Sequence, residues 1–352
     1  MKISFAKKTR GIAVIFVLIA ITVLSILAGL FAYAMKVETR LATNSNNDEA
    51  LLWIGRAGVE RARWILAIEG QVPFTDNNQI WAGGPGEGPE TNSALAGISL
   101  DNFPVGEGTV SLKMIELESK ININSADTPL IQQALTTMGV NASDISVVSD
   151  SIQDWVDPDD ATRPAGAESD YYQGMTPPYF SKNAPMDDIA ELLLIKNVNP
   201  PMFKGGAATN DMGATFQHHH LGFGTAPGET PDYPFGLRDI FTPFSTGKVN
   251  VNTASENVLS CIPGLDTTSV QNILKFRSGE GGTDGSMAVQ NLGQLTSVVG
   301  AQAMAQINRY GTVRGSVYEV HATAQIAEYK REYIAVLFRF GPNVQVVSFH
   351  WN

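Results

Sequence analysis

The feature that most constrains this chain is an uncharged run near its N-terminus, from Ile12 to Met35. At about 1.5 Å per residue, a helix of this length crosses the roughly 30 Å hydrocarbon core of a bilayer. The run is longer than the apolar part of a secretory signal peptide. The nearest match to a signal-peptide cleavage site is Ala32-Tyr33-Ala34. The sequence therefore predicts a membrane anchor that the mature chain keeps.

The residues before this run are basic. Lys2, Lys7, Lys8 and Arg10 carry four positive charges, and no acidic residue accompanies them. Positive charge beside a membrane helix favours the cytoplasmic side. We therefore expect a single-pass inner-membrane protein with a cytoplasmic N-terminus and a periplasmic body.

Helical character continues beyond the apolar run. Residues 36–68 contain no proline, and Leu52, Val59, Ala62 and Leu66 recur on one helical face. One helix over residues 12–68, with residues 12–35 in the membrane, would be about 85 Å long. The alternative is an anchor, a break near residues 43–47 and a separate short helix.

Charge and cysteine content limit the function of the body. The 352-residue chain has a formal net charge of −11, or about −15 without its four N-terminal cations. A body this acidic binds phosphate poorly, so we expect no nucleic-acid partner. The single cysteine, Cys261, cannot form an intrachain disulfide and is expected to be a small buried apolar residue.

Two regions of alternating apolar residues enclose a duplicated segment. Residues 108–117 predict one strand, and residues 317–351 predict two or three antiparallel strands. Between them, "SKININSA" at 119–126 resembles "GKVNVNTA" at 247–254. Each copy is expected to be a short extended segment followed by a helix, with Ser125 or Thr253 as its N-cap.

The second copy continues as a helix, a Pro-Gly turn and a second helix, which resembles a helix-hairpin-helix. In nucleic-acid-binding examples the turn presents backbone N–H groups to phosphate. Here Asp266 follows Pro263-Gly264-Leu265 and places a negative charge where phosphate would approach. A packing role is therefore expected, and a membrane-anchored DNA-binding protein is the less favoured alternative.

An acidic stretch separates the two copies. Its carboxylates suit a hard cation such as Ca²⁺, although their spacing is not that of an EF-hand. The alternative is a solvated loop that caps neighbouring helices. The candidate calcium ligands are Asp154, Asp157, Asp159, Glu168 and Asp170.

Two further segments lie between the copies. Asp187 or Asp188 is expected to cap a helix that ends at Pro200-Pro201. Residues 205–236 are expected to form a loop, and the run His218–His220 within it is expected to be solvated. The chain contains no G-x-S-x-G, H-E-x-x-H or C-x-x-C motif, and we expect it not to be an enzyme.

These motifs together resemble the type II secretion minor pseudopilin K family, also called the general secretion pathway protein K family. The matching segments are "RGIAVIF", "SKININSA", "DWVDPDDATRPAGAESDYY", "KNAPMDDIAELLLIKNV", "GKVNVNTASENVLSCIPGL" and "VVSFHW". The resemblance implies a pilin-like α+β fold: a long N-terminal transmembrane helix packed on an antiparallel sheet, with a large helical domain inserted into the sheet. It also implies calcium in the inserted domain.

The resemblance implies a domain order. A leader (1–11) precedes the long helix (12–68), and the pilin-like body comprises residues 69–118 and 306–352. The inserted domain, residues 119–305, would contain two helix-hairpin-helix or SAM-like repeats.

The resemblance also implies processing and partners. Prepilin peptidase would cut between Gly11 and Ile12 and methylate the new N-terminus. Most relatives have Glu at the fifth mature position, where this chain has Phe16. An apolar residue there suits a subunit that starts a filament at its tip.

The implied partners are minor pseudopilins I and J, minor pseudopilin H, the major pseudopilin and the inner-membrane assembly platform. A minor pilin of a system related to type IV pili is the alternative.

Overall fold

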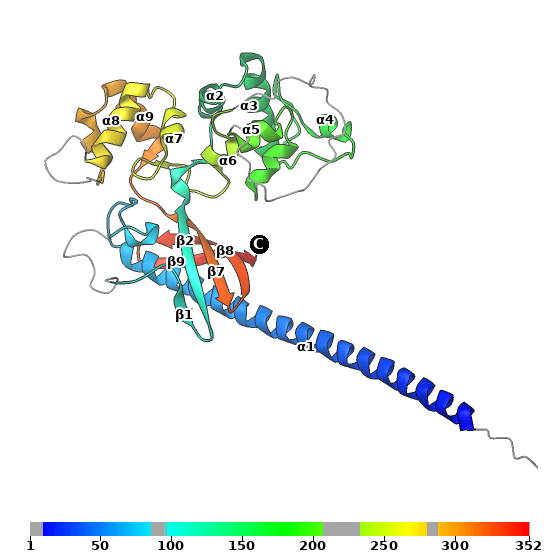
Figure 1. Ribbon diagram of the computed structural model, residues 1–352. Coiled ribbons are helices and arrows are strands. Elements are labelled where there is room, and N and C mark those ends of the chain that lie inside the picture. Colours follow the sequence, from blue (N-terminus) through cyan, green and yellow to red (C-terminus); the bar gives the residue numbers. More distant parts are fainter. Residues whose placement is uncertain (1–9, 86–94, 96, 207–232, 280–287, 352) are drawn as a thin grey trace, which may run out of the picture.

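The computed structural model describes residues 10–85, 95, 97–206, 233–279 and 288–351. One long helix packs on an antiparallel sheet, and a group of shorter helices lies beyond one end of that sheet (Figure 1). The strands of the sheet come from before and after these helices, so the helical part is an insertion. The expected α+β architecture is confirmed.

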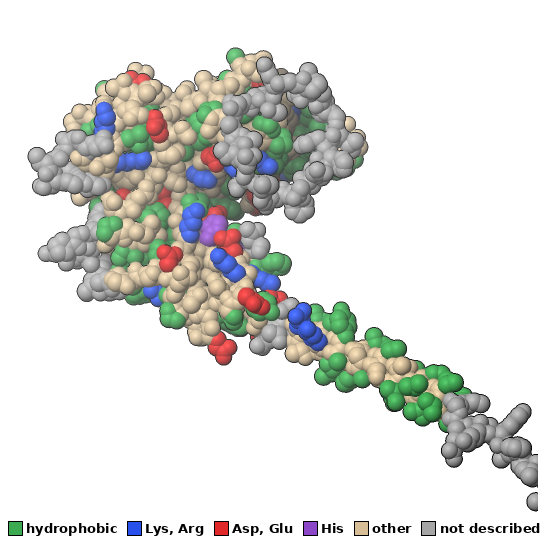
Figure 2. Space-filling model, in the orientation of Figure 1, with side chains coloured by type: hydrophobic (Ala, Val, Ile, Leu, Met, Phe, Trp, Pro, Cys, Tyr) green, Lys and Arg blue, Asp and Glu red, His purple; other side chains and the backbone are tan. Residues whose placement is uncertain are grey.

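Helix α1 runs unbroken from Arg10 to Glu69, so the alternative of two separate helices is wrong. A helix of this length extends about 90 Å. All side chains from Ala13 to Ala42 are exposed where α1 projects beyond the sheet, and most are hydrophobic (Figure 2). The helix is long and apolar enough to cross a membrane, with an 18-residue window of mean hydropathy 3.0.

The main sheet has five antiparallel strands in the order β1-β2-β7-β8-β9. Alternate residues of β2, such as Val110, Leu112 and Met114, are buried and pack with α1 in one core. The strands are β1 (Phe103–Val105), β2 (Gly108–Glu116), β7 (Val317–Ile326), β8 (Tyr329–Phe340) and β9 (Asn343–Trp351).

Two glycines let α1 approach the sheet closely. A Cβ on Gly55 would overlap the Tyr333 ring, and one on Gly58 would lie 2.8 Å from Val110 Cγ2. Side chains at these two positions would push the helix away from β2 and β8. The glycines therefore determine how tightly the outer half of α1 is held.

The insertion contains the same order of elements twice. The second copy has a short strand, two helices, a 3₁₀ helix, another helix and a short strand parallel to the first, and the first copy follows the same order with two additional short helices. The first copy comprises β3 (Ile121–Asn122), α2 (Thr128–Thr137), α3 (Ala142–Val156), α4 (Ser169–Gln173), η3 (Ile189–Leu194), α5 (Pro200–Lys204), α6 (Leu237–Ile240) and β4 (Phe241–Thr242). The second comprises β5 (Val249–Asn250), α7 (Glu256–Ser260), α8 (Thr267–Ser278), η4 (Leu292–Ser297), α9 (Ala301–Tyr310) and β6 (Gly311–Thr312).

Both copies share one hydrophobic core, separate from the core under α1. Cys261 is fully buried in it, and burial raises the pKa of its thiol to about 12. The second copy extends to Thr312 at the end of β6, a few residues past the expected boundary at residue 305. Short 3₁₀ helices η1 (Ile80–Ala82) and η2 (Leu117–Ser119) complete the described elements.

A buried polar network joins the insertion to the sheet. Glu116 at the end of β2 accepts a hydrogen bond from Thr253 Oγ1 at 2.5 Å. Glu118 accepts from the backbone N–H groups of Thr246, Ser316 and Val317. Burial, and then the charge of Glu118, raise the pKa of Glu116 well above its usual value.

Three local expectations need correction. The N-caps are Asp127 and Ser255, each two residues after the expected Ser125 and Thr253, because a turn follows each short strand. Asp188 does cap a helix, but η3 is a 3₁₀ helix. Pro200 begins α5 and does not end a helix, because proline suits a first helical position.

Candidate functional site

The acidic stretch forms a partly buried carboxylate cluster between α3 and α4. Asp154 lies in the last turns of α3, Asp157 is its C-cap, and Glu168 is the N-cap of α4. The only cation paired with them in the described structure is Arg163. Its Nε lies 3.3 Å from Asp154 Oδ1 and its Nη2 lies 3.4 Å from Asp157 Oδ2.

Glu168 is the least satisfied member of this cluster. It is 2% exposed, and neither of its carboxylate oxygens has a hydrogen-bond partner of good geometry, although the Ser181 hydroxyl lies beside it. Burial, and then the charges of Asp154, Asp157 and Asp160, raise the pKa of Glu168 to about 7. Asp157 Oδ1 is also buried without a partner. A bound cation would neutralise these carboxylates, and their unpaired oxygens would coordinate it.

Only three of the five candidate calcium ligands lie close together in the structure. Asp154, Asp157 and Glu168 come together, whereas Asp159 and Asp170 are exposed. Asp159 accepts a hydrogen bond from the Ala161 N–H at 2.8 Å, as a capping side chain does. Asp170 lies in the first turn of α4.

Asp160 was not among the candidate ligands, yet its charge acts on Glu168. Its Oδ1 accepts hydrogen bonds from Ser169 Oγ and Asn183 Nδ2, both at 2.9 Å. The sequence shows Asp160 within the acidic stretch, but it has no signal that distinguishes it from Asp159.

The donor set suits calcium, because the unpaired oxygens of Asp157 and Glu168 are carboxylate oxygens. In the described residues, however, no three Asp, Glu, His or Cys side chains are placed to hold a metal ion as they stand. Asp154, Asp157 and Glu168 would hold the ion after Arg163 turned away from Asp154 and Asp157. An ion there would fix the α3–α4 connection by cross-linking its two ends.

The paired Asn motifs have the same structural role in both copies. Asn124 Nδ2 donates to Met186 O at 3.0 Å, and its Oδ1 accepts from Met186 N at 2.7 Å. Asn252 makes the equivalent pair with Val289, at 3.0 and 2.8 Å. Each amide thus clamps the segment that leads into η3 or η4.

The lysines of the two motifs are also equivalent. Lys120 Nζ donates to Arg238 O in α6 at 2.8 Å, and Lys248 Nζ donates to Arg309 O in α9. Each lysine therefore binds a last-turn carbonyl of the final helix in its own copy, where a cation is favourable. The resemblance between "SKININSA" and "GKVNVNTA" thus reflects one repeated structure.

Comparison with known proteins shows what this chain is similar to. Residues 111–205, which include the first Asn clamp and the carboxylate cluster, match the family model described as type II secretion system (T2SS), protein K. Over 218 residues, the chain is 24% identical to type II secretion system protein K of Aeromonas hydrophila. The match to the Aeromonas protein covers 56% of the chain and 61% of the relative's length. Both comparisons support a resemblance to the type II secretion system protein K family.

A solved structure shares the fold of this chain. It is the crystal structure of the GspK-GspI-GspJ complex from the type 2 secretion system of enterotoxigenic Escherichia coli. The TM-score is 0.61 at 13% sequence identity, and the match covers 88% of this chain and 99% of the other.

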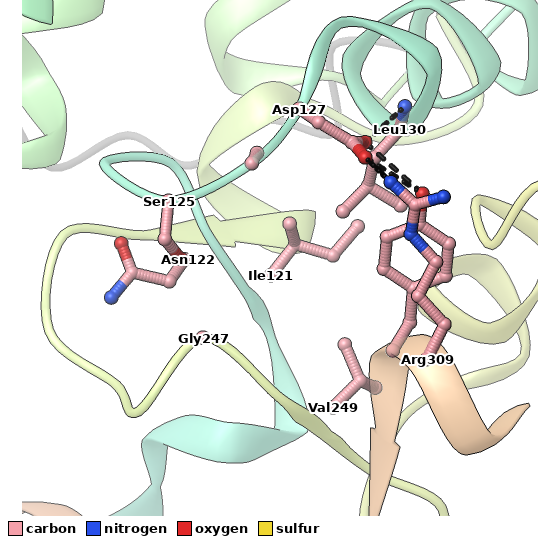
Figure 3. Close-up of a pocket in the computed structure, with 10 residues that line it drawn as sticks. Ile121, Asn122, Ser125, Asp127, Leu130, Gly247, Val249 and Arg309 are labelled. Atoms are coloured by element: carbon pink, nitrogen blue, oxygen red, sulfur yellow. Dashed lines mark hydrogen bonds and ion pairs between the residues drawn. The ribbon is translucent and has the colours of Figure 1, made fainter.

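A cavity of about 200 Å³ lies between the two copies of the repeat (Figure 3). At its edge, Arg309 Nη2 in α9 lies 2.6 Å from Asp127 Oδ2, and the Tyr310 hydroxyl donates to the same oxygen at 2.9 Å. Asp127 also caps α2 by accepting from Leu130 N. Both oxygens of the Asp127 carboxylate are therefore engaged, in capping α2 and in joining the two copies.

The helix-hairpin-helix turn provides the N-cap of its own second helix, α8. Asp266 Oδ1 accepts from Ser269 N at 2.9 Å at the start of α8. The carboxylate thus lies at the helix N-terminus that a phosphate would approach in a nucleic-acid-binding hairpin. The loop run His218–His220 lies outside the described residues.

The predicted processing residues lie at the beginning of α1. Gly11 and Ile12 fall in its first turn. Phe16 is 68% exposed on the projecting part of the helix.

Proposed function

We propose that this chain is a minor pseudopilin at the tip of a type II secretion pseudopilus, where it starts assembly and supports protein export across the outer membrane. The observation that carries the proposal is the combination of an unbroken pilin-like helix with an apolar residue, Phe16, near its start. The role is structural and not catalytic.

The location follows from charge and hydropathy. The basic leader favours a cytoplasmic N-terminus, and the exposed apolar half of α1 needs a bilayer. The sheet and insertion then lie in the periplasm, with the chain anchored once in the inner membrane.

Processing is proposed at the junction between basic leader and apolar helix. Prepilin peptidase would cut between Gly11 and Ile12 and methylate Ile12. Gly11→Val is expected to leave an uncut, membrane-bound and inactive protein. N-terminal sequencing of active protein that still began at Met1 would refute this cleavage site.

Phe16 supports the tip position through electrostatics. A Glu at this place in relatives lies in an apolar helix bundle, where an unpaired carboxylate costs several kcal/mol. The resemblance implies that the N-terminal amine of the preceding subunit neutralises it. The first subunit has no predecessor, so an apolar side chain avoids the cost.

The tip assignment can be tested at Phe16. Cells carrying only Phe16→Glu are expected to make stable, cleaved protein but fewer pseudopili and to secrete less. Phe16→Leu, which keeps an apolar side chain, is the matched control and is expected to behave as the unaltered chain. Labelling of this subunit along the filament shaft would contradict a tip position.

The proposed partners are pseudopilins I and J, because the solved structure with this fold is titled as a complex of protein K with GspI and GspJ. Pseudopilin H, the major pseudopilin and the inner-membrane assembly platform are further proposed partners. Co-purification of the membrane-extracted chain with I and J tests the first pair. Calcium is proposed to order the acidic connection between α3 and α4.

A further inference from the structure

The turn that follows β5 in the second copy of the repeat binds a glutamate side chain. Thr253 Oγ1 donates to Glu116 Oε2 at 2.5 Å, and Asn250 Nδ2 donates to Glu116 Oε1 at 3.4 Å. Glu116 lies at the end of β2, outside the repeat, and is 2% exposed. This turn is therefore a binding site for a glutamate that another element of the fold supplies.

The turn that follows β3 in the first copy is built in the same way. Asn122 Oδ1 accepts a hydrogen bond from Asn124 N at 2.8 Å. Asn250 Oδ1 accepts the equivalent bond from Asn252 N at 3.1 Å. Because the first Asn of each motif fixes the turn through the same bond, equivalent residues of the two turns present their side chains from equivalent positions.

The first copy lacks the glutamate. Ser125 stands where the second copy has Thr253, and both side chains end in a hydroxyl. Within the described residues, the Ser125 hydroxyl has no hydrogen-bond partner, and Ser125 is exposed. Asn122 Nδ2 is already used, because it donates to Ser245 O at 2.6 Å. The Ser125 hydroxyl is therefore the group that remains open to a ligand.

This hydroxyl lines the cavity between the two copies. Ser125 lies on one side of the cavity and Arg309 on the other, with the apolar side chains of Ile121 and Val249 between them (Figure 3). Gly247 has a φ of +85°, and a Cβ at this position would lie 2.8 Å from Ser125 Oγ. The absence of a side chain at Gly247 therefore leaves the hydroxyl accessible from the cavity.

The size of the cavity limits what it can hold. Its volume of about 200 Å³ is below the roughly 300–1,000 Å³ of sites that enclose a small-molecule ligand. One long side chain fits this volume. The apolar surface of Ile121 and Val249 suits the methylene groups of such a side chain, and the Ser125 hydroxyl suits a polar group at its end.

Charge at the rim favours a carboxylate. Among the described residues that line the cavity, only Asp127 and Arg309 carry a charge. Asp127 is engaged by Arg309 Nη2, the Tyr310 hydroxyl and Leu130 N. Arg309 is 63% exposed and uses only Nη2 for this pair in the described structure. Its other N–H groups are therefore available to an incoming anion.

We propose that the cavity between the two copies binds a glutamate side chain from a segment of another protein. The methylene groups of that glutamate lie along Ile121 and Val249, its carboxylate accepts a hydrogen bond from the Ser125 hydroxyl, and Arg309 supplies the positive charge. The first copy thus binds between molecules the group that the second copy binds within the chain. This site does not rest on the tip assignment or on calcium.

Methyl NMR spectroscopy of the full chain in detergent tests the site. The probes are tripeptides with blocked ends that carry glutamate, glutamine or aspartate between two glycines. We expect the glutamate peptide, at millimolar concentration, to shift the methyl signals of Ile121, Leu130 and Val249. The signals of Val110, in the core under α1, should stay unchanged.

The other two peptides test the chemistry of recognition. The glutamine peptide should bind about tenfold more weakly, because it has no charge for Arg309. The aspartate peptide should also bind more weakly, because its side chain is one methylene shorter and does not span the apolar stretch to Ser125. Equal affinities for the glutamate and glutamine peptides would overturn the inference.

Substitutions at Ser125 locate the ligand. Ser125→Ala should lower the affinity for the glutamate peptide about tenfold with an unchanged melting temperature. Ser125→Thr, which introduces the residue of the second copy, should keep the affinity. Ser143→Ala is the matched control, because Ser143 is equally classed as exposed and lies in α3. An unchanged affinity in Ser125→Ala would refute the site.

Free glutarate distinguishes a protein side chain from a free small acid. Glutarate should bind no more tightly than the glutamate peptide, because Arg309 is the only cation among the described lining residues. Binding of glutarate at least tenfold tighter would show that the cavity serves a free acid and would overturn the inference. Methyl signals that none of the peptides shifts would overturn it as well.

Discussion

Two hydrogen bonds join the side-chain amide of Asn252 to the backbone of Val289. Asn252 Nδ2 donates to the Val289 carbonyl oxygen, and Asn252 Oδ1 accepts from the Val289 N–H, as in a pair of neighbouring strands. Both residues are buried, at 4% and 0% exposure. The clamp holds the segment before η4 against the start of the second copy. Asn124 and Met186 repeat the arrangement in the first copy.

Removal of this clamp should destabilise the insertion. Asn252→Ala leaves the Val289 N–H and carbonyl buried without partners, which costs about 2–4 kcal/mol. The measurement is urea unfolding of the detergent-solubilised chain, followed by far-ultraviolet circular dichroism. Asn272→Ala removes a single half-buried bond to Val298 O and should cost about 1 kcal/mol. Equal losses in the two variants would contradict the clamp.

Calcium should stabilise the chain in a way that depends on Glu168. Millimolar calcium should raise the melting temperature of the unaltered protein relative to a chelator. Glu168→Gln should abolish most of the increase, whereas Asp159→Asn, at an exposed capping residue, should keep it. Identical melting curves with calcium and chelator would show that the acidic connection binds no ion.

The pH dependence of Glu168 supplies a separate test. Its folded-state pKa of about 7 lies above its unfolded value, so the folded protein holds the proton more tightly. Without calcium, the stability from this proton is present below the unfolded pKa and is lost as pH rises to about 7. With calcium the ionised form is needed, so apparent calcium affinity should fall as pH drops below 7. A calcium affinity that stays constant from pH 5 to 8 would contradict the role of Glu168.

Glu116 should make the stability of the junction between sheet and insertion fall as pH rises. Its folded-state pKa is raised by burial and by Glu118, so its stabilising proton is lost as pH rises through that value. Glu116→Gln keeps the shape without the charge and should flatten the decline in melting temperature as pH rises above the unfolded-state pKa of a glutamate. Glu118→Gln should lower stability at every pH, because Glu118 accepts three backbone hydrogen bonds. A Glu116→Gln profile parallel to that of the unaltered chain would refute this assignment.

Gly55 should be intolerant of any side chain. Gly55→Ala would place its Cβ in the Tyr333 ring and should cost about 1–3 kcal/mol by forcing α1 from β8. Gly29→Ala is the matched control, because nothing lies within 4 Å of that position in the chain. Thermal melting followed by near-ultraviolet circular dichroism measures the loss, and equal melting temperatures would contradict close packing at Gly55.

The large elements of this fold were predictable because their signals are local. The uncharged run and the absence of proline predict α1, and apolar alternation predicts β2 and the three C-terminal strands. The parallel pairs β3–β4 and β5–β6 were not predictable, because each has two residues per strand and joins segments far apart in the chain. The capping residues Asp127 and Ser255 were missed because their positions depend on the turns before them.

The candidate metal site was predictable in composition but not in geometry. The sequence shows many carboxylates between Asp154 and Asp170. It does not show that Glu168 is buried while Asp159 is exposed, because burial there depends on packing between α3 and α4. Likewise, the repeated Asn residues marked a duplication. Their partners Met186 and Val289 precede similar capping boxes, Asp188–Glu191 and Asn291–Gln294, but that similarity does not by itself place them beside the Asn residues.

The unbroken course of α1 has a mechanical consequence. From Ala13 to Glu69 the helix contains no proline at which it could fold. Its outer half packs closely against the face of the sheet at Gly55 and Gly58. A force along the axis at the exposed apolar end of α1 is therefore passed on to the sheet, and a shift equal to the rise of one residue moves the sheet by about 1.5 Å. The sheet and the exposed apolar segment of α1 therefore move as one piece.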